Sequence, residues 1–167
     1  MAYLLDTNVF IEAKSRYYGM DFCPAFWDWL QEQNDAGKVF SIERVAVELA
    51  AGSDELPSWA AQKGKTFFLP PDQGMLAALP TVSQWVQNQN YLQSAVNNFL
   101  QDTDYYLIAH ALAYNHTIVT HEIADQSVKR VKIPNVCVGV NIKCMNTFEM
   151  LRVERARFVL DNTSRIA

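Results

Sequence analysis

The feature that most constrains the fold is an alternation of short apolar runs with longer stretches of helical periodicity. Strand-like runs stand at residues 3–5, 39–41, 117–120 and 135–140, the last of them with a possible continuation at 142–144. Alternating strands and helices of this length predict a parallel sheet covered by helices on both faces. We therefore expect an α/β fold, a three-layer α/β/α sandwich with a central parallel sheet of four to five strands.

The expected helices have recognisable start and stop signals. They run from Pro24 to about Gly37, from Ser41 to Gly52, over 104–115, and from a cap at Thr147 onwards. Residues 82–100 are expected to form one long or two short helices, and 52–80 a short helix and loops. No repeat or linker divides the chain. We expect a single domain over residues 1–160 and a C-terminal tail over 161–167.

The composition is that of an ordinary folded protein. Half of the 167 residues are apolar and 19% are charged, and the length suits one domain. No run approaches the ~20 apolar residues of a membrane span, and Asp6 and Glu12 interrupt any secretory signal. These features predict a cytoplasmic protein. The net charge of −4 argues against non-specific nucleic-acid binding through a broad basic face.

Four acidic residues stand beside apolar segments, where acids are not expected. Asp6 closes an apolar strand, and Glu122 lies two residues beyond the strand that ends at Thr120. Asp104 occupies the first turn of an apolar helix, and Glu48 borders the apolar stripe of another. Each also has a structural explanation: Asp104 as a helix-dipole partner, Asp6 as a cap, and Glu48 and Glu122 as surface acids.

Bringing such acids together requires a cation. Two carboxylates ~5 Å apart repel by about 3 kcal/mol at an effective dielectric of ~20. Oxygen ligands without His or Cys favour Mg²⁺ or Mn²⁺, and the three cysteines form no C-x-x-C unit that would favour zinc. If the four acids meet in space, the sequence therefore predicts a magnesium or manganese site.

The order of these acids resembles that of PIN-domain ribonucleases. Residues 4–11 resemble the opening motif of that family, an apolar strand running into D-[ST]-[NS], and 39–49 resemble its second strand and acid-bearing helix. Residues 104–111 are similar to its D-x-x-[IL]-[IL]-A helix. Residues 118–122 resemble its last motif, [LV]-V-T-x-D, with Glu122 in place of the usual Asp. The amino-acid sequences of residues 17–19, 26–30 and 131–137 resemble those of a toxin-like prokaryotic subgroup long carried as a domain of unknown function.

The resemblance implies a metal-dependent endoribonuclease that hydrolyses RNA phosphodiesters. The residues implied to bind Mg²⁺ or Mn²⁺ and to catalyse are Asp6, Glu48, Asp104 and Glu122. Asn8 and Thr120 would orient Asp6 and the water network, although Asn8 could instead cap a helix. Asp102 competes with Asp104 as the third acid, and the spacing to the following apolar residues favours Asp104.

Two small basic clusters remain after the acids are assigned. The first, Lys129, Arg130 and Lys132, is a candidate for substrate binding, and the second is Arg152, Arg155 and Arg157. The alternative for both clusters is solvated surface.

The resemblance also implies a setting. Small stand-alone PIN domains are typical toxins of toxin–antitoxin pairs, which implies an antitoxin protein that covers the site. Many relatives dimerise, and four tryptophans, Trp27, Trp29, Trp59 and Trp85, either serve such a contact or lie in the core.

Other functions fit the sequence less well. The non-enzyme alternative is a catalytically inactive PIN-fold binding or scaffold protein. A haloacid-dehalogenase-like phosphatase would need a second Asp at position 8, which is Asn8. A flap-type nuclease would carry helical clamps for which the chain has no room.

Overall fold

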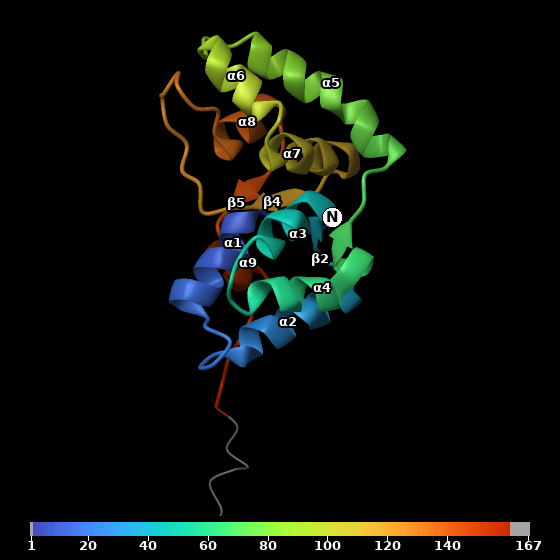
Figure 1. Ribbon diagram of the computed structural model, residues 1–167, viewed down its shortest axis with the longest axis vertical. Coiled ribbons are helices and arrows are strands. Elements are labelled where there is room, and N and C mark those ends of the chain that lie inside the picture. Colours follow the sequence, from blue (N-terminus) through green and yellow to red (C-terminus); the bar gives the residue numbers. More distant parts are fainter. Residues whose placement is uncertain (1, 161–167) are drawn as a thin grey trace, which may run out of the picture.

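The expected three-layer architecture and parallel sheet are confirmed in the computed structural model, which describes residues 2–160 (Figure 1). Five parallel strands pair in the order β3-β2-β1-β4-β5. Their bounds are β1 Tyr3–Leu5, β2 Val39–Ile42, β3 Phe68–Leu69, β4 Thr117–Val119 and β5 Cys144–Met145. The tail predicted at 161–167 lies outside the described residues.

Helices cover both faces of this sheet (Figure 1). One face carries α1 (Thr7–Glu12), which continues into a π-helical turn over Ala13–Tyr17, with α2 (Pro24–Asp35), α3 (Glu43–Ala50), α4 (Leu56–Phe67) and α9 (Thr147–Val153). The other face carries α5 (Gln73–Gln87), α6 (Gln93–Phe99), α7 (Thr103–Tyr114) and α8 (Ile133–Gly139).

Strand β1 is the centre of the sheet and of the core. Leu4 and Leu5 are fully buried, and β1 pairs with β2 on one side and with β4 on the other. The chain first extends the sheet through β2 to β3, then returns to the other side of β1 for β4 and β5. This reversal makes the β1–β4 boundary a topological switch point, where the carboxyl ends of parallel strands leave a crevice.

The predicted strand at 135–140 is wrong, because this segment forms helix α8. Its valines favour a strand, but Pro134 lies in the first turn, where proline is compatible with a helix. The buried residues Ile133, Val136 and Cys137 are three and four positions apart, which is the helical period. The fifth strand is β5, which overlaps the predicted continuation at 142–144 only at Cys144.

Other differences concern short elements and caps. The segment 52–80, expected to hold a short helix and loops, contains the 12-residue helix α4, strand β3 and the start of α5. Ser41 does not cap α3: it lies in β2 and donates its hydroxyl to the Leu5 carbonyl oxygen at 2.6 Å. Asn146, not Thr147, caps α9. Residues 82–100 contain two helices, the end of α5 and α6.

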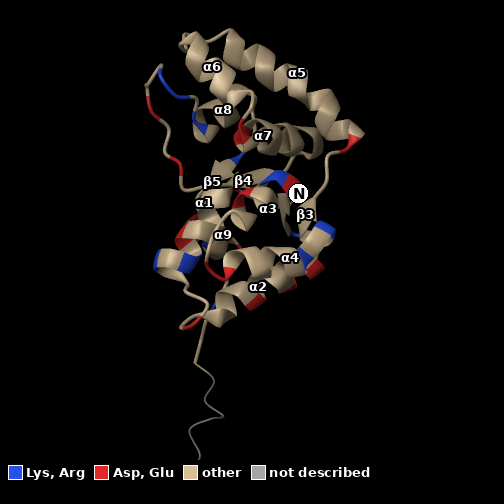
Figure 2. Cartoon of the chain, in the orientation of Figure 1, with Lys and Arg blue, Asp and Glu red and all other residues tan. Residues whose placement is uncertain are grey.

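The core interpretation of the tryptophans is confirmed. Trp27 is buried, and the other three pack, partly buried, against the core cluster. Helices α5 and α6 contain no charged residue (Figure 2), so the charges that act on the carboxyl ends of β1 and β4 come from other elements. Among residues 2–160 no helix is both long and apolar enough to cross a membrane.

Candidate functional site

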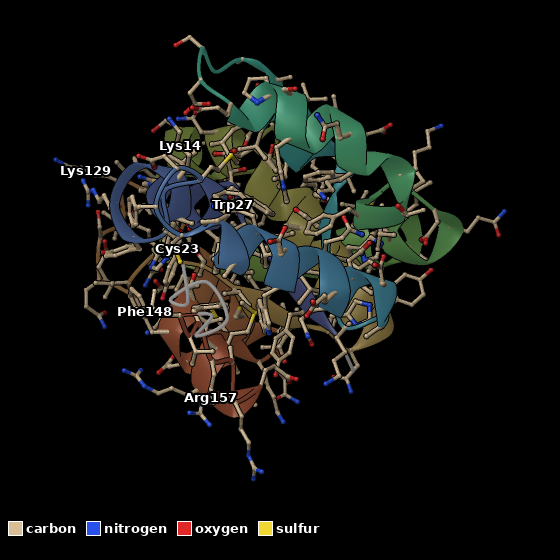
Figure 3. All side chains as sticks on the ribbon, turned by 90° about the horizontal axis from the view of Figure 1, so that it is seen from below. Lys14, Cys23, Trp27, Lys129, Phe148 and Arg157 are labelled. Atoms are coloured by element: carbon tan, nitrogen blue, oxygen red, sulfur yellow. The ribbon has the colours of Figure 1, made fainter. Side chains whose placement is uncertain are left out.

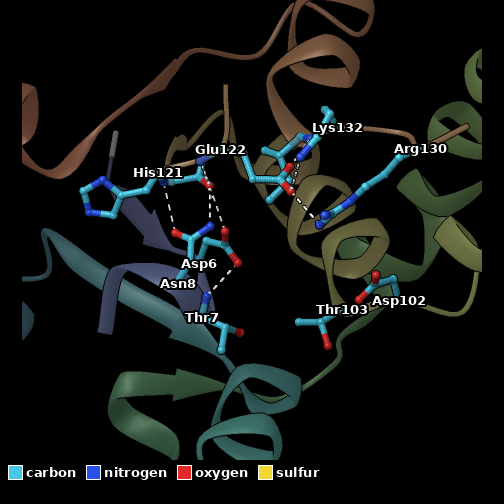
Figure 4. Close-up of polar contacts among 11 residues, drawn as sticks. Asp6, Thr7, Asn8, Asp102, Thr103, His121, Glu122, Arg130 and Lys132 are labelled. Carbon is cyan, nitrogen blue, oxygen red and sulfur yellow. Dashed lines mark hydrogen bonds and ion pairs between the residues drawn. The ribbon is translucent and has the colours of Figure 1, made fainter. Parts of the chain in front are cut away.

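Asp6 is held at the carboxyl end of β1 by two hydrogen bonds (Figure 4). Its Oδ1 accepts the backbone N–H of Thr7 at 2.7 Å, which makes Asp6 the N-cap of α1. Its Oδ2 accepts the hydroxyl of Thr120 at 2.8 Å. The residue is only 4% exposed, so this carboxyl group has little contact with solvent.

Thr120 and Asn8 fix the orientation of this carboxyl group. The Thr120 hydroxyl accepts the Asn8 side-chain amide and the Glu122 backbone N–H, both at 3.0 Å. The Asn8 side-chain oxygen accepts the His121 backbone N–H at 3.0 Å. With both acceptor positions of the hydroxyl in use, its only proton points to Asp6. Asn8 lies inside α1, which Asp6 caps, so the capping alternative for Asn8 does not hold.

Asp102 and Asp104 have different roles in α7. Asp102 is exposed and is the N-cap, accepting the Thr103 backbone N–H at 2.8 Å. Asp104 lies two residues further along, about half a turn, and is half-buried, and the charges of Asp6 and Glu48 both raise its pKa. Of the two candidates for the third acid, Asp104 is the one whose pKa the charge of Asp6 raises.

Glu48 joins the two segments that carry the buried acids. From the exposed face of α3, its carboxylate accepts the hydroxyls of Thr7 and Thr103, the latter at 2.6 Å. Thr7 directly follows Asp6, and Thr103 directly precedes Asp104. The sequence interpretation did not single out these two threonines. The available signal was a hydroxyl residue adjacent to each of two candidate acids.

Burial and repulsion by neighbouring acids act on the buried Asp6 and the half-buried Asp104. Burial is the main cause that raises the pKa of Asp6 to about 7, and the charges of Glu122 and Glu48 raise it further, against the hydrogen bonds from Thr120 and Thr7. The pKa of Asp104 is raised to about 8, by burial first and then by Asp6 and the other nearby acids. The crevice therefore disfavours negative charge.

Glu122 is held differently, by basic groups of the loop after β4 (Figure 4). Its Oε1 lies 2.8 Å from Arg130 and 3.5 Å from Lys132, and its Oε2 accepts the Ile133 backbone N–H at 2.9 Å. Two members of the candidate substrate-binding cluster are thus engaged with a candidate metal ligand. Lys129 is exposed and makes no ion pair with any described residue.

The donor chemistry of the crevice fits a hard divalent cation, with a limit on the number of direct ligands. Within residues 2–160 no three His, Cys, Asp or Glu side chains are arranged to hold one ion. Mg²⁺ keeps several waters and is often bound through only one or two carboxylates. Asp6 and Asp104 are the two carboxyl groups of the site whose pKa values are raised, so a bound cation would stabilise their ionised forms.

The site opens to solvent beside these acids. A cavity of about 430 Å³ is lined by Asn8, Glu12, His121, Glu122 and Lys132, among others. A second cavity, of about 490 Å³, shares His121 and Glu122 with it and extends towards α8 and α9. A ligand can therefore approach the carboxyl ends of β1 and β4 from solvent.

Comparisons with known proteins give one result. No curated protein and no solved structure matches the chain. The model of a family described as a domain of unknown function, DUF4411, matches residues 3–158, a span that includes every candidate site residue. The protein therefore belongs to the DUF4411 family.

Proposed function

We propose that this protein is a PIN-like, metal-dependent endoribonuclease that hydrolyses RNA phosphodiesters with Mg²⁺ or Mn²⁺. The observations that support the proposal are Asp6 at the carboxyl end of β1, beside the switch point, and Asp104 in the first turn of α7, whose pKa the charge of Asp6 raises. Within residues 2–160, no Lys, Arg or His forms an ion pair with either Asp6 or Asp104. A fold that keeps such a pair is better explained by cation binding than by stability.

Asp6 and Asp104 would hold the metal directly. When bound, such a metal lowers the pKa of a coordinated water and stabilises charge on a leaving oxygen. Thr120 and Asn8 keep Asp6 oriented, and Glu48 positions the flanking threonines. Glu122 would contribute through water, or directly if it left Arg130 and Lys132, and those two cations would then face the RNA.

The biological setting that fits best is the cytoplasmic toxin of a toxin–antitoxin pair. An antitoxin protein would inhibit such an enzyme by covering the crevice or by placing an Arg between the carboxylates. Homodimer formation is part of the same proposal, because it is common in the family that the motifs resemble. The tryptophans are engaged with the core, so such a contact would use other residues.

A non-catalytic binding protein is the second candidate, and the ion pairs of Glu122 favour it. An acid held by Arg130, Lys132 and the Ile133 N–H serves structure without any metal. The two candidates differ in whether Asp6 and Asp104 bind a cation.

Metal-dependent stability and RNA cleavage test the proposal. Thermal melts with EDTA and with titrated Mg²⁺ or Mn²⁺ should show stabilisation of about 2.7 kcal/mol at ~100 times the dissociation constant. Asp104→Asn should abolish both the metal shift and cleavage of a single-stranded RNA. Asp102→Asn is the matched control, because Asn caps a helix as well as Asp does and the residue is exposed. No metal shift in the wild type at millimolar concentrations, together with no cleavage, would leave the binding protein as the better description.

A further inference from the structure

An aromatic surface adjoins the acidic crevice on the side away from Arg130. In Figure 4 the His121 ring points away from Glu122 and its basic partners. The Tyr17 ring lies 5.8 Å from that of His121 and 5.0 Å from that of Phe148, and the last two are 5.7 Å apart, centroid to centroid. Tyr17 is 40% exposed. Since Asn8 holds the His121 backbone, these three rings adjoin the network that orients Asp6.

A basic groove continues from this aromatic surface. Phe148 also lines a cavity of about 360 Å³, together with Tyr18, Phe158 and the three arginines Arg152, Arg155 and Arg157. All three arginines are exposed. Figure 3 shows Phe148 and Arg157 on the C-terminal segment, with the Arg157 side chain extending outward. We name the aromatic–arginine groove by its six exposed or lining residues, Tyr17, His121, Phe148, Arg152, Arg155 and Arg157.

The charge of this groove is not offset within the described part of the chain. None of its three arginines forms an ion pair with a residue in 2–160. Glu154, which precedes Arg155, is instead engaged by Lys38 and by the Tyr3 hydroxyl, each at 2.8 Å. By contrast, the charges of Arg130 and Lys132 are offset by Glu122. In a chain of net charge −4, the groove is therefore a local site for anions.

We infer that the aromatic–arginine groove binds single-stranded RNA and leads it to the crevice at Asp6 and Asp104. Aromatic faces stack on unpaired bases, and arginines alongside them neutralise the phosphates, which is how single strands are bound without sequence preference. Paired bases are already stacked on each other, so a duplex cannot offer its base faces to these rings. This inference rests on the proposed function for its substrate class, but it concerns binding and not cleavage.

RNA binding in EDTA tests the groove separately from catalysis. Fluorescence anisotropy of a labelled 12-nucleotide oligouridine would be measured with the full chain over a range of KCl concentrations. Three phosphate contacts predict a slope of log affinity against log salt of about −2, and each lost contact removes about 0.7. The double variant Arg152→Gln, Arg157→Gln should therefore bind more weakly, with the slope reduced by about 1.4. Tyr17→Ala should weaken binding about tenfold through lost stacking.

The matched control removes two exposed charges elsewhere. The control is the double variant Lys65→Gln, Lys143→Gln, which makes the same change of net charge. Lys65 lies in α4, and Lys143 directly precedes β5, at the end of that strand away from the acids. It should bind as the wild type does. Circular dichroism melts verify that the arginine variants remain folded, and the single variant Arg157→Gln serves if the double variant does not.

The outcomes separate this inference from the proposed function. The inference about the groove would be overturned if the double arginine variant had the affinity and salt slope of the wild type, or if duplex RNA bound as tightly as single-stranded RNA. No RNA binding by the wild type would also overturn it and would favour a peptide partner at the same surface. Binding that depends on the groove without cleavage in Mg²⁺ or Mn²⁺ would refute only the nuclease. Cleavage that the arginine variants leave unchanged would refute only the groove.

Discussion

Thr120→Val is expected to destabilise the protein strongly, because one buried hydroxyl makes three hydrogen bonds at the candidate site. Thr120 is 2% exposed, donates to Asp6 at 2.8 Å, and accepts from Asn8 and from the Glu122 backbone at 3.0 Å each. Valine has nearly the same shape and can make none of these bonds. The substitution therefore isolates the contribution of the hydroxyl from that of packing.

The magnitude follows from the three bonds. A hydrogen bond to a charged group contributes ~1.5–3 kcal/mol and a neutral one about 1 kcal/mol, which gives roughly 3–5 kcal/mol in all. The added methyl group offsets about 0.8 kcal/mol of this loss. A net loss of roughly 2–4 kcal/mol corresponds to a fall in Tm of roughly 4–16 °C for a domain of this size. The pKa of Asp6 should also rise further, since the Thr120 hydroxyl is what lowers it most.

Urea denaturation in EDTA at pH 7 measures the loss, with Thr120→Ser as the control. Serine keeps the hydroxyl and removes a buried methyl, so it should lose about 1 kcal/mol. If Thr120→Val is no less stable than Thr120→Ser, the hydroxyl does not hold the site together, and the network deduced for Asp6 and Asn8 is refuted.

Two further predictions concern pH and the sheet. Because the pKa values of Asp6 and Asp104 are raised to about 7 and about 8, and an unfolded Asp titrates near ~3.9, the folded state retains protons that the unfolded state releases. Metal-free protein should therefore lose stability as pH rises from about 4 to 8. Urea unfolding at pH 5 and pH 8 should give a lower free energy of unfolding at pH 8. If Asp104→Asn leaves the difference between the two pH values unchanged, the prediction is contradicted. Ser41→Ala should lose about 1–3 kcal/mol in a thermal melt, because the Leu5 carbonyl loses a buried donor. A change below ~0.5 kcal/mol would contradict this prediction, and Ser94→Ala, at an exposed position, is the control.

The long-range order of the fold was predictable because hydrophobic periodicity records burial. The run at β1 is apolar since both faces of a central parallel strand are covered. The same use of apolar runs gave a wrong prediction at α8, because its valines are typical of a strand although the segment that begins at Ile133 and Pro134 is helical. Strand β3 has only two residues, too few to show a period.

The site was predictable only where it depends on the ends of elements. A strand end and a helix first turn indicate where Asp6 and Asp104 lie, and the structure has Asp6 directly after β1 and Asp104 in the first turn of α7. The hydrogen-bond and ion-pair partners of Glu48 and Glu122 depend on side-chain rotamers and on the path of the loop after β4. Spacing along the chain therefore could not show that two threonines hold Glu48, or that Arg130 and Lys132 hold Glu122.

The different surroundings of the four acids determine which of them a cation should bind most strongly. Glu122 already has two cationic partners, so a metal bound there must compete with them. Asp6 and Asp104 repel each other in a buried crevice, so a cation there relieves burial and repulsion together. The free energy gained from the metal should therefore depend far more on Asp104 than on Glu122. Equal loss of the metal-induced Tm shift in Asp104→Asn and Glu122→Gln would show instead that Glu122 leaves its basic partners to bind the ion.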